Sequence, residues 1–251
     1  SFMIHCYSQP DDITWQQCFG VEGTEIDRPK CIEKTKTGYL ISIGLSNYAP
    51  QIPHYHAEGE GWIISLDSLG NKIWERCYGG SEGDNTEKII SIDEYHFYLF
   101  GHGLSTDGDI QNNRPGSLWV VKIDAQGNIL WENNYGSILE KEHARDALLT
   151  DDGGLIMMCR IMGAGGDITE YFGSNDIWVC KIDSIGNIEW EKTLGNNALD
   201  NALNMILTSQ NTLMIVGGHY ESGGMIQCPD LGNYGADAWI VEMDMDGNML
   251  R

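Results

Sequence analysis

Positive charge is scarce in this sequence. Lysine and arginine together number 15, against 37 aspartates and glutamates, which leaves a formal net charge of −22. Binding to nucleic acid or to an anionic membrane surface needs clustered basic side chains. The composition therefore argues against both kinds of partner, while cations, glycans and basic proteins stay open.

Long apolar runs and metal-type cysteine motifs are also missing. No window approaches the ~20 apolar residues of a membrane-spanning helix, so we expect no transmembrane segment. The 7 cysteines follow no repeated spacing and form no CxxC or Cys/His pattern, which argues against a zinc site or a disulfide framework. One pair, Cys159 and Cys180, is predicted to lie on antiparallel neighbouring strands, so a disulfide between them is one possibility.

Tryptophan, by contrast, is regularly spaced. The 8 tryptophans fall into two registers whose members recur about every 58 residues. A fixed period of this length is typical of repeat architectures. The first register is Trp62, Trp119, Trp178 and Trp239; the second is Trp15, Trp74, Trp131 and Trp190. Such strict spacing predicts that these side chains pack the repeats together rather than bind a ligand.

A D-x-x-G-N run follows each first-register tryptophan. Asp124, Gly127 and Asn128 form one copy, between the apolar stretches WVVKI and ILWE. Asp caps a turn through its side chain, Gly accepts positive φ, and Asn tolerates the left-handed region. Each run predicts a tight hairpin between two strands.

A second hairpin precedes this one in every unit, because two further apolar segments are split by turn residues such as those at 36–38. Four short antiparallel strands per repeat predict a blade of a β-propeller. We therefore expect an all-β fold, a single propeller domain over residues 13–251 with four blades. The strand-like segment Ile13–Phe19 is predicted to close the ring by joining the C-terminal blade. A fragment of a longer propeller is the open alternative.

Residues 1–12 match no repeat. This N-terminal extension has an apolar start, a cysteine and small residues, which fit the remnant of a signal peptide or a lipid-attachment segment at Cys6. An irregular extension is the other interpretation. An exported location, at the cell surface, in the periplasm or secreted, is the corresponding expectation.

The repeat consensus resembles a known group of proteins. Its residues are Trp74–Asp84, Ser105–Asp109 and Leu118–Trp131, and the similarity runs over nearly all of the chain from Ile13. They are similar to the propeller repeats of secreted and cell-surface proteins of Bacteroidetes-type bacteria. The resemblance implies export and a surface role, and it implies no particular chemistry. The first repeat departs from the pattern at Gln51–Glu60.

Three sets of side chains are candidates for a metal ion, with Ca²⁺ as the candidate cofactor. Asp107 and Asp109 stand beside glycines in a loop, and oxygen-rich loops suit Ca²⁺. Four acids precede the first strand of each unit and would converge if those strands line a channel. Alternating His54 and His56 would suit a transition metal. The competing interpretation is local turn and strand capping. The four acids are Asp27, Asp84, Glu142 and Asp200.

Aromatic side chains in the long loops between second and third strands are candidates for ligand recognition. Tyr55, Tyr171 and Tyr234 lie there, with Arg114 as an isolated cation. Tyrosine offers a flat apolar face and one hydroxyl, which suits sugars and protein partners. The alternative is that these rings pack the loops onto the blades.

No catalytic motif is present, since a G-x-S-x-G elbow, a P-loop and an HExxH sequence are all missing. The sequence therefore favours a non-catalytic binding or interaction module for a glycan or a protein. A carbohydrate-active enzyme, hydrolase or lyase, with carboxylates at the channel mouth is the first alternative. A structural scaffold is the second. Two carboxylates converging at that mouth would favour the enzyme.

Overall fold

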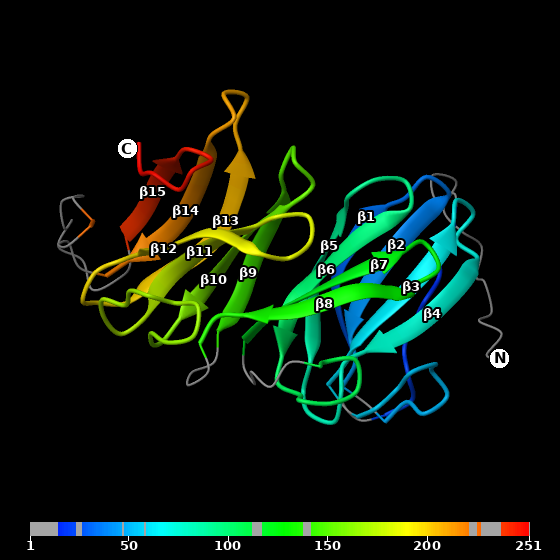
Figure 1. Ribbon diagram of the computed structural model, residues 1–251. Helices are drawn as coiled ribbons and strands as arrows, with labels where there is room; N and C mark the ends of the chain where they lie inside the picture. Colours follow the sequence, from blue (N-terminus) through cyan, green and yellow to red (C-terminus); the bar gives the residue numbers. More distant parts are fainter. Residues whose placement is uncertain are drawn as a thin grey trace.

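The computed structural model describes residues 15–23, 27–46, 48–57, 59–111, 117–137, 142–220, 225–226 and 237–250. Within them fifteen β-strands form four antiparallel sheets, which confirms the all-β prediction (Figure 1). We number the sheets 1 to 4 in chain order. Neighbours in each sheet follow one another along the chain, so every sheet is a meander.

The strand bounds follow the predicted repeat. Sheet 1 contains β1 (Arg28–Lys34), β2 (Gly38–Gly44), β3 (Gly61–Asp67) and β4 (Lys72–Tyr78). Sheet 2 contains β5 (Asn85–Ser91), β6 (His96–Gly103), β7 (Ser117–Asp124) and β8 (Ile129–Tyr135). Sheet 3 contains β9 (His143–Leu149), β10 (Leu155–Ile161), β11 (Asp176–Ile182) and β12 (Ile188–Leu194). Sheet 4 contains β13 (Asp200–Leu207), β14 (Leu213–His219) and β15 (Asp237–Met243).

The D-x-x-G-N turns close the hairpins as predicted. Asp124 Oδ1 accepts hydrogen bonds from the backbone N–H groups of Gln126 and Asn128, both at 2.9 Å. The Asn128 side chain donates to Asp124 Oδ2, and Gly127 has φ +81°. The same Asp–Asn contacts recur at Asp67, Asp183 and Asp244. One side-chain network therefore sets the same turn in all four sheets.

The two tryptophan registers pack differently. First-register side chains are buried in the sheets, with Trp119 and Trp178 almost fully covered. Second-register side chains lie over the turn glycine of the following sheet, as Trp74 does at Gly127 and Trp190 at Gly247. Trp74 Nε1 donates to the Ala125 carbonyl at 3.0 Å. The regular spacing thus serves packing, within sheets and between them.

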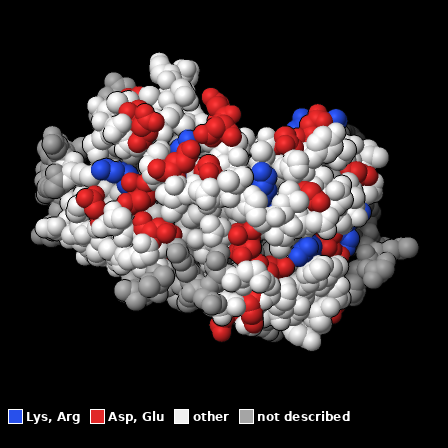
Figure 2. Space-filling model, viewed as in Figure 1, with Lys and Arg blue, Asp and Glu red and all other residues white. Residues whose placement is uncertain are grey.

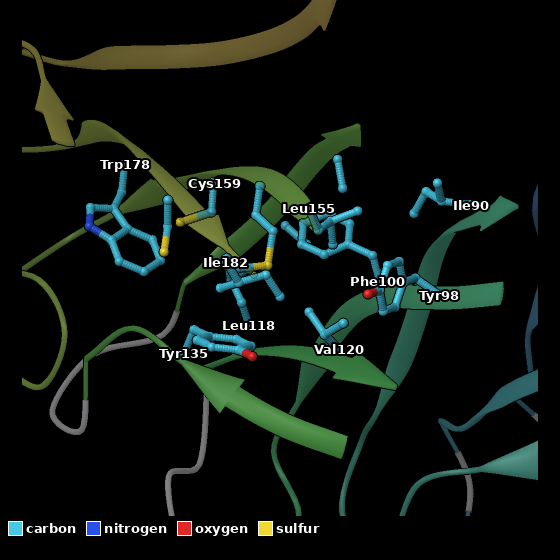
Figure 3. Close-up of a cluster of buried hydrophobic side chains, with 14 of the residues drawn as sticks. Ile90, Tyr98, Phe100, Leu118, Val120, Tyr135, Leu155, Cys159, Trp178 and Ile182 are labelled. Atoms are coloured by element: carbon cyan, nitrogen blue, oxygen red, sulfur yellow. The ribbon is translucent and has the colours of Figure 1, made fainter. Parts of the chain in front are cut away.

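The inner strands β1, β5, β9 and β13 lie next to one another in that order. An apolar core fills each space between consecutive sheets. In the core between sheets 2 and 3, Tyr98, Leu118 and Val120 face Leu155, Trp178 and Ile182 (Figure 3). These three cores fix each sheet on the next and hold the loops described below.

The N-terminal segment differs from the prediction. Ile13 lies outside the described residues, and residues 15–20 form no strand. Trp15 instead lies on sheet 1, 6.3 Å from the ring of Tyr39 and over Gly70. Sheet 4 has three strands within the described residues, and sheets 1 and 4 lie at opposite ends of the molecule (Figure 1).

The predicted disulfide option is wrong. Cys159 and Cys180 do lie on antiparallel neighbours, but the register pairs Cys159 with Trp178 and Cys180 with Met157. Both cysteines are buried free thiols. Residues offset diagonally by two positions are about 7–8 Å apart, which exceeds the Cα separation that a disulfide spans.

Acidic side chains spread over the viewed surface, and the fewer basic ones lie among them (Figure 2). Several form ion pairs between sheets, such as Lys30 with Glu87 at 2.8 Å. Among the described residues no helix is long and apolar enough to cross a membrane.

Candidate functional site

The acids that begin the inner strands each hold the loop in front of them. Asp84 accepts the Gly80 N–H at 2.7 Å, Glu142 accepts the Ser137 N–H at 2.7 Å, and Asp200 accepts the Asn196 N–H at 2.7 Å. Asp27 does the same for Val21 at 2.9 Å. In the described part of the chain no three acidic, His or Cys side chains come close enough to hold a metal ion. These contacts support the alternative of local capping for the four acids.

The other predicted metal ligands also serve local structure. Asp107 Oδ1 accepts the Ser81 N–H at 2.7 Å, whereas Asp109 pairs with Arg76 at 2.9 Å. His56 Nδ1 lies 2.6 Å from the buried Glu60. His54 sits in a turn with φ +60°. These contacts support capping and loop folding.

Two of the predicted aromatic recognition residues, Tyr55 and Tyr171, are described, and they pack against different cores. Tyr55 packs at the edge of the core of sheet 1 and meets Tyr48 edge to face, with ring centroids 5.7 Å apart. Tyr171 packs against the core between sheets 2 and 3. Arg114 and Tyr234 lie outside the described residues. The positions of Tyr55 and Tyr171 support the alternative interpretation, in which these rings pack the loops onto the sheets.

A second set of acids begins the third strands, two residues before the first-register tryptophan. It consists of Glu60, Asp176 and Asp237, with Ser117 at the equivalent place in sheet 2. Sequence reasoning missed this set, although an acid at this position in three of four repeats was the available signal. Glu60 and Asp176 are fully buried.

Asp176 and Asp200 converge on Gly195. A methyl group at Gly195 would lie 2.1 Å from Asp176 Oδ1 and 2.8 Å from Asp200 Oδ2, so both carboxyl groups approach the same backbone atom. Each residue is 0% exposed. Among the described residues, Oδ1 of Asp176 and Oδ1 of Asp200 have no hydrogen-bond partner.

The environment of this pair favours the protonated form. Burial raises the pKa of Asp200 to about 6, with a further rise from Asp176; the Asn196 N–H and His219 act in the opposite direction. Burial also raises the pKa of Asp176, against hydrogen bonds from the Phe172 and Gly173 N–H groups. Loss of water around a carboxylate disfavours its charge. One carboxyl group therefore titrates near neutral pH.

A pocket of about 770 Å³ adjoins the pair between sheets 3 and 4. Two of its walls are the segments that the acids hold, since Asp176 accepts the Phe172 N–H at 2.7 Å and Asp200 accepts the Asn196 N–H. Glu170 adds an exposed carboxylate and Lys192 a half-buried cation. The lining residues are Glu170, Phe172, Lys192, Gly195, Asn196, Asn197, Met225, Gly247, Asn248 and Met249.

Comparison with solved structures identifies the class of fold as a β-propeller, which supports reading the sheets as blades. One similar structure is an α-L-arabinanase of Penicillium chrysogenum complexed with arabinobiose, with a TM-score of 0.51 and 12% sequence identity. The match covers 88% of this chain and 64% of that one, so this chain spans less than two thirds of the arabinanase. No family model and no curated protein matches the sequence.

The comparison also corrects the functional prediction. The sequence favoured a non-catalytic binding module, but the similar propeller is an enzyme. The first alternative, a carbohydrate-active enzyme, fits this finding better, and two carboxyl groups do converge at the loop-bearing end of sheets 3 and 4. The sequence favours a binding module only through its lack of a catalytic motif, and that absence carries little weight when acids come from separate repeats.

Proposed function

We propose that this chain is a carbohydrate-active enzyme, a hydrolase or lyase, that binds an oligosaccharide in the pocket between sheets 3 and 4. The buried Asp176–Asp200 pair carries the proposal, because a carboxyl group with a pKa of about 6 is suited to proton transfer near neutral pH. Environments that separate the pKa values of neighbouring acids are how such enzymes divide the roles of acid and base. The propeller-type arabinanase lends support through the arabinobiose that it binds.

The role of Asp200 follows from its pKa, and that of Glu170 from its exposure in the pocket. Asp200, protonated below a pH of about 6, supplies the proton to the departing glycosidic oxygen. Glu170, exposed in the pocket, supplies the second carboxylate. Asp176 raises the pKa of Asp200 and holds the Phe172 wall, so it is a positioning residue. Since Asp200 has no exposed surface, the proposal requires the Gly195–Asn197 wall to move aside when substrate binds.

Turnover of defined oligosaccharides tests this proposal. Arabino-, xylo-, gluco- and galacto-oligosaccharides would be incubated with the chain, and new reducing ends and unsaturated products measured. We expect D200N and E170Q to lower kcat about 10²- to 10⁴-fold, the range that general acid–base groups supply. D151N, at an exposed hairpin position, is the matched control. Full activity in both pocket variants, or no turnover of any substrate, contradicts the proposal.

The proposal extends to architecture and location. Four blades per chain agree with the four sheets of the structure, of which sheet 4 has three strands within the described residues. An exported location follows from the resemblance to surface-protein repeats. Fractionation of expressing cells, with the N-terminal sequence of the mature chain determined, tests it.

A further inference from the structure

Sheet 4 presents an apolar face that no described residue covers. On this face Ile240 of β15 is 60% exposed and Ile206 of β13 is 54% exposed. Met214 and Val216 of β14 lie between them and are half-buried. Together with Asn204 and Met205 they line a shallow hollow of about 150 Å³. We call this surface the forward face of sheet 4.

The equivalent faces of the other sheets are buried. Ile240 occupies the place of Ile63, Val120 and Val179, each with 0% exposure. Met214 likewise matches Leu40, Tyr98 and Ile156, which are buried. These positions are buried because each of sheets 1 to 3 is covered by the sheet that follows it. Figure 3 shows this for the face of sheet 2 that carries Tyr98 and Val120. The forward face of sheet 4 is therefore built like an interface.

The opposite end of the molecule carries the complementary residue. Ile32 of β1 is 61% exposed, whereas its equivalents Ile89, Ala147 and Met205 are buried. Each equivalent shares a core with the forward-face pair of the sheet before it. Ile89 clusters with Leu40 and Ile63, Ala147 with Tyr98 and Val120, and Met205 with Ile156 and Val179. Among the described residues Ile32 has no such pair of forward-face residues beside it, and Met214 and Ile240 are the pair that remains uncovered.

We propose that sheet 1 of a second copy of this chain docks on the forward face of sheet 4. Ile32 of the second copy then packs against Met214 and Ile240, in the arrangement that the three internal interfaces share. The N-terminal segment of that copy, from Trp15 onward, continues the outer strand beside β15, whose C-terminal end already pairs with Met249 and Leu250. Trp15 already lies over Gly70 as Trp74 lies over Gly127, which is the place of an outer strand of a preceding sheet.

The arrangement of the sheets favours a second copy over closure within one chain. Sheets 1 and 4 lie at opposite ends of the molecule (Figure 1). Bringing them together would change all three intervening interfaces, each with its own packed core, and close-packed interiors do not deform continuously. A second copy leaves these cores intact. The contact is head to tail, so it builds closed rings or open chains.

Sedimentation velocity of the full chain over a wide concentration range tests the proposal. We expect concentration-dependent association that strengthens with salt, because each copy carries a formal net charge of −22 and salt screens the repulsion. I240E and I32K should each abolish association. I185E changes an isoleucine that is 72% exposed on a turn outside both faces, so it should associate like the unchanged chain.

Mixing the two disabled variants separates head-to-tail docking from nonspecific association. The I32K chain keeps an intact forward face and the I240E chain keeps an intact Ile32, so an equimolar mixture should form a dimer that neither forms alone. Unchanged circular dichroism of each variant confirms folding, since both positions are exposed. A chain that stays monomeric at every concentration and salt overturns the proposal, as does a mixture without dimer or an I185E chain that fails to associate. The association measured here does not depend on whether the chain turns over a glycan.

Discussion

Replacing Asp200 by asparagine should stabilise the protein, and only above a certain pH. Burial raises the pKa of this carboxyl group from an ordinary 3.8 to about 6. One pKa unit corresponds to about 1.36 kcal/mol, so ionised Asp200 costs the folded state about 3 kcal/mol. Between these pH values the folded state binds more protons than the unfolded one, and stability falls as pH rises. Asparagine keeps an oxygen for the Asn196 N–H and carries no charge.

The free energy of unfolding of the two chains, measured in urea at pH 4, 5, 6, 7 and 8, checks this prediction. We expect D200N and the unchanged chain to match near pH 4, and D200N to be more stable by up to about 3 kcal/mol at pH 8. Titrating groups that do not interact with Asp200 are common to both chains, so their contributions cancel in the difference. The exposed D151N variant should show no such trend. A difference that does not change with pH, or D200N being less stable at pH 8, refutes the reasoning.

Two further predictions concern the repeats. D84N should lower the free energy of unfolding by about 2 kcal/mol at pH 7, measured in urea. Asp84 accepts hydrogen bonds from four donors, and the NH₂ group of an asparagine would face two of them. An unchanged free energy of unfolding would contradict this. G127A should lower the free energy of unfolding by about 1–2 kcal/mol in the same assay. Gly127 has φ +81°, and an added methyl group would lie 3.0 Å from Trp74. The matched G83A places its methyl 3.8 Å from Leu104 and should be neutral; equal losses would disprove the strain argument.

The repeating part of the fold could be predicted because its determinants are local. The Asp124–Asn128 hydrogen bonds and the positive φ of Gly127 lie within five residues, so the sequence pattern contains the whole turn. The tryptophan spacing reflects one packing contact made at every sheet boundary, for example Trp74 over Gly127. Residues that obey a repeat for packing reasons are visible in one sequence.

The parts that the sequence pattern does not determine depend on contacts between repeats. The segment Ile13–Phe19 has a strand-like sequence, but the partner edge that it needs belongs to sheet 4 at the far end of the molecule. The pairing of Cys159 and Cys180 failed because a shift of two residues in register does not alter the apolar pattern. Convergence of Asp176 and Asp200 on Gly195 joins three segments, and no spacing rule encodes it.

The acids that begin the inner strands show why position in a repeat does not decide function. Asp84 and Asp200 are equivalent in sequence and both are buried, yet their surroundings differ in the number of donors. Four donors surround Asp84, three of them from Leu104 and Ser105. Asp200 accepts the Asn196 N–H and retains an unpaired oxygen within the described structure, beside the second carboxyl group of Asp176.

This difference has a direct chemical consequence. A carboxylate that accepts several hydrogen bonds is stabilised in its charged form, whereas a buried carboxylate with few donors holds its proton to a higher pH. A buried acid of the repeat that has fewer donors therefore holds its proton to a higher pH without any change of residue. Among the described residues, Asp200 accepts the Asn196 N–H and keeps its Oδ1 unpaired, and burial raises its pKa to about 6. The site that we propose thus depends on the connections between strands, and the shared repeat supplies the frame that holds them.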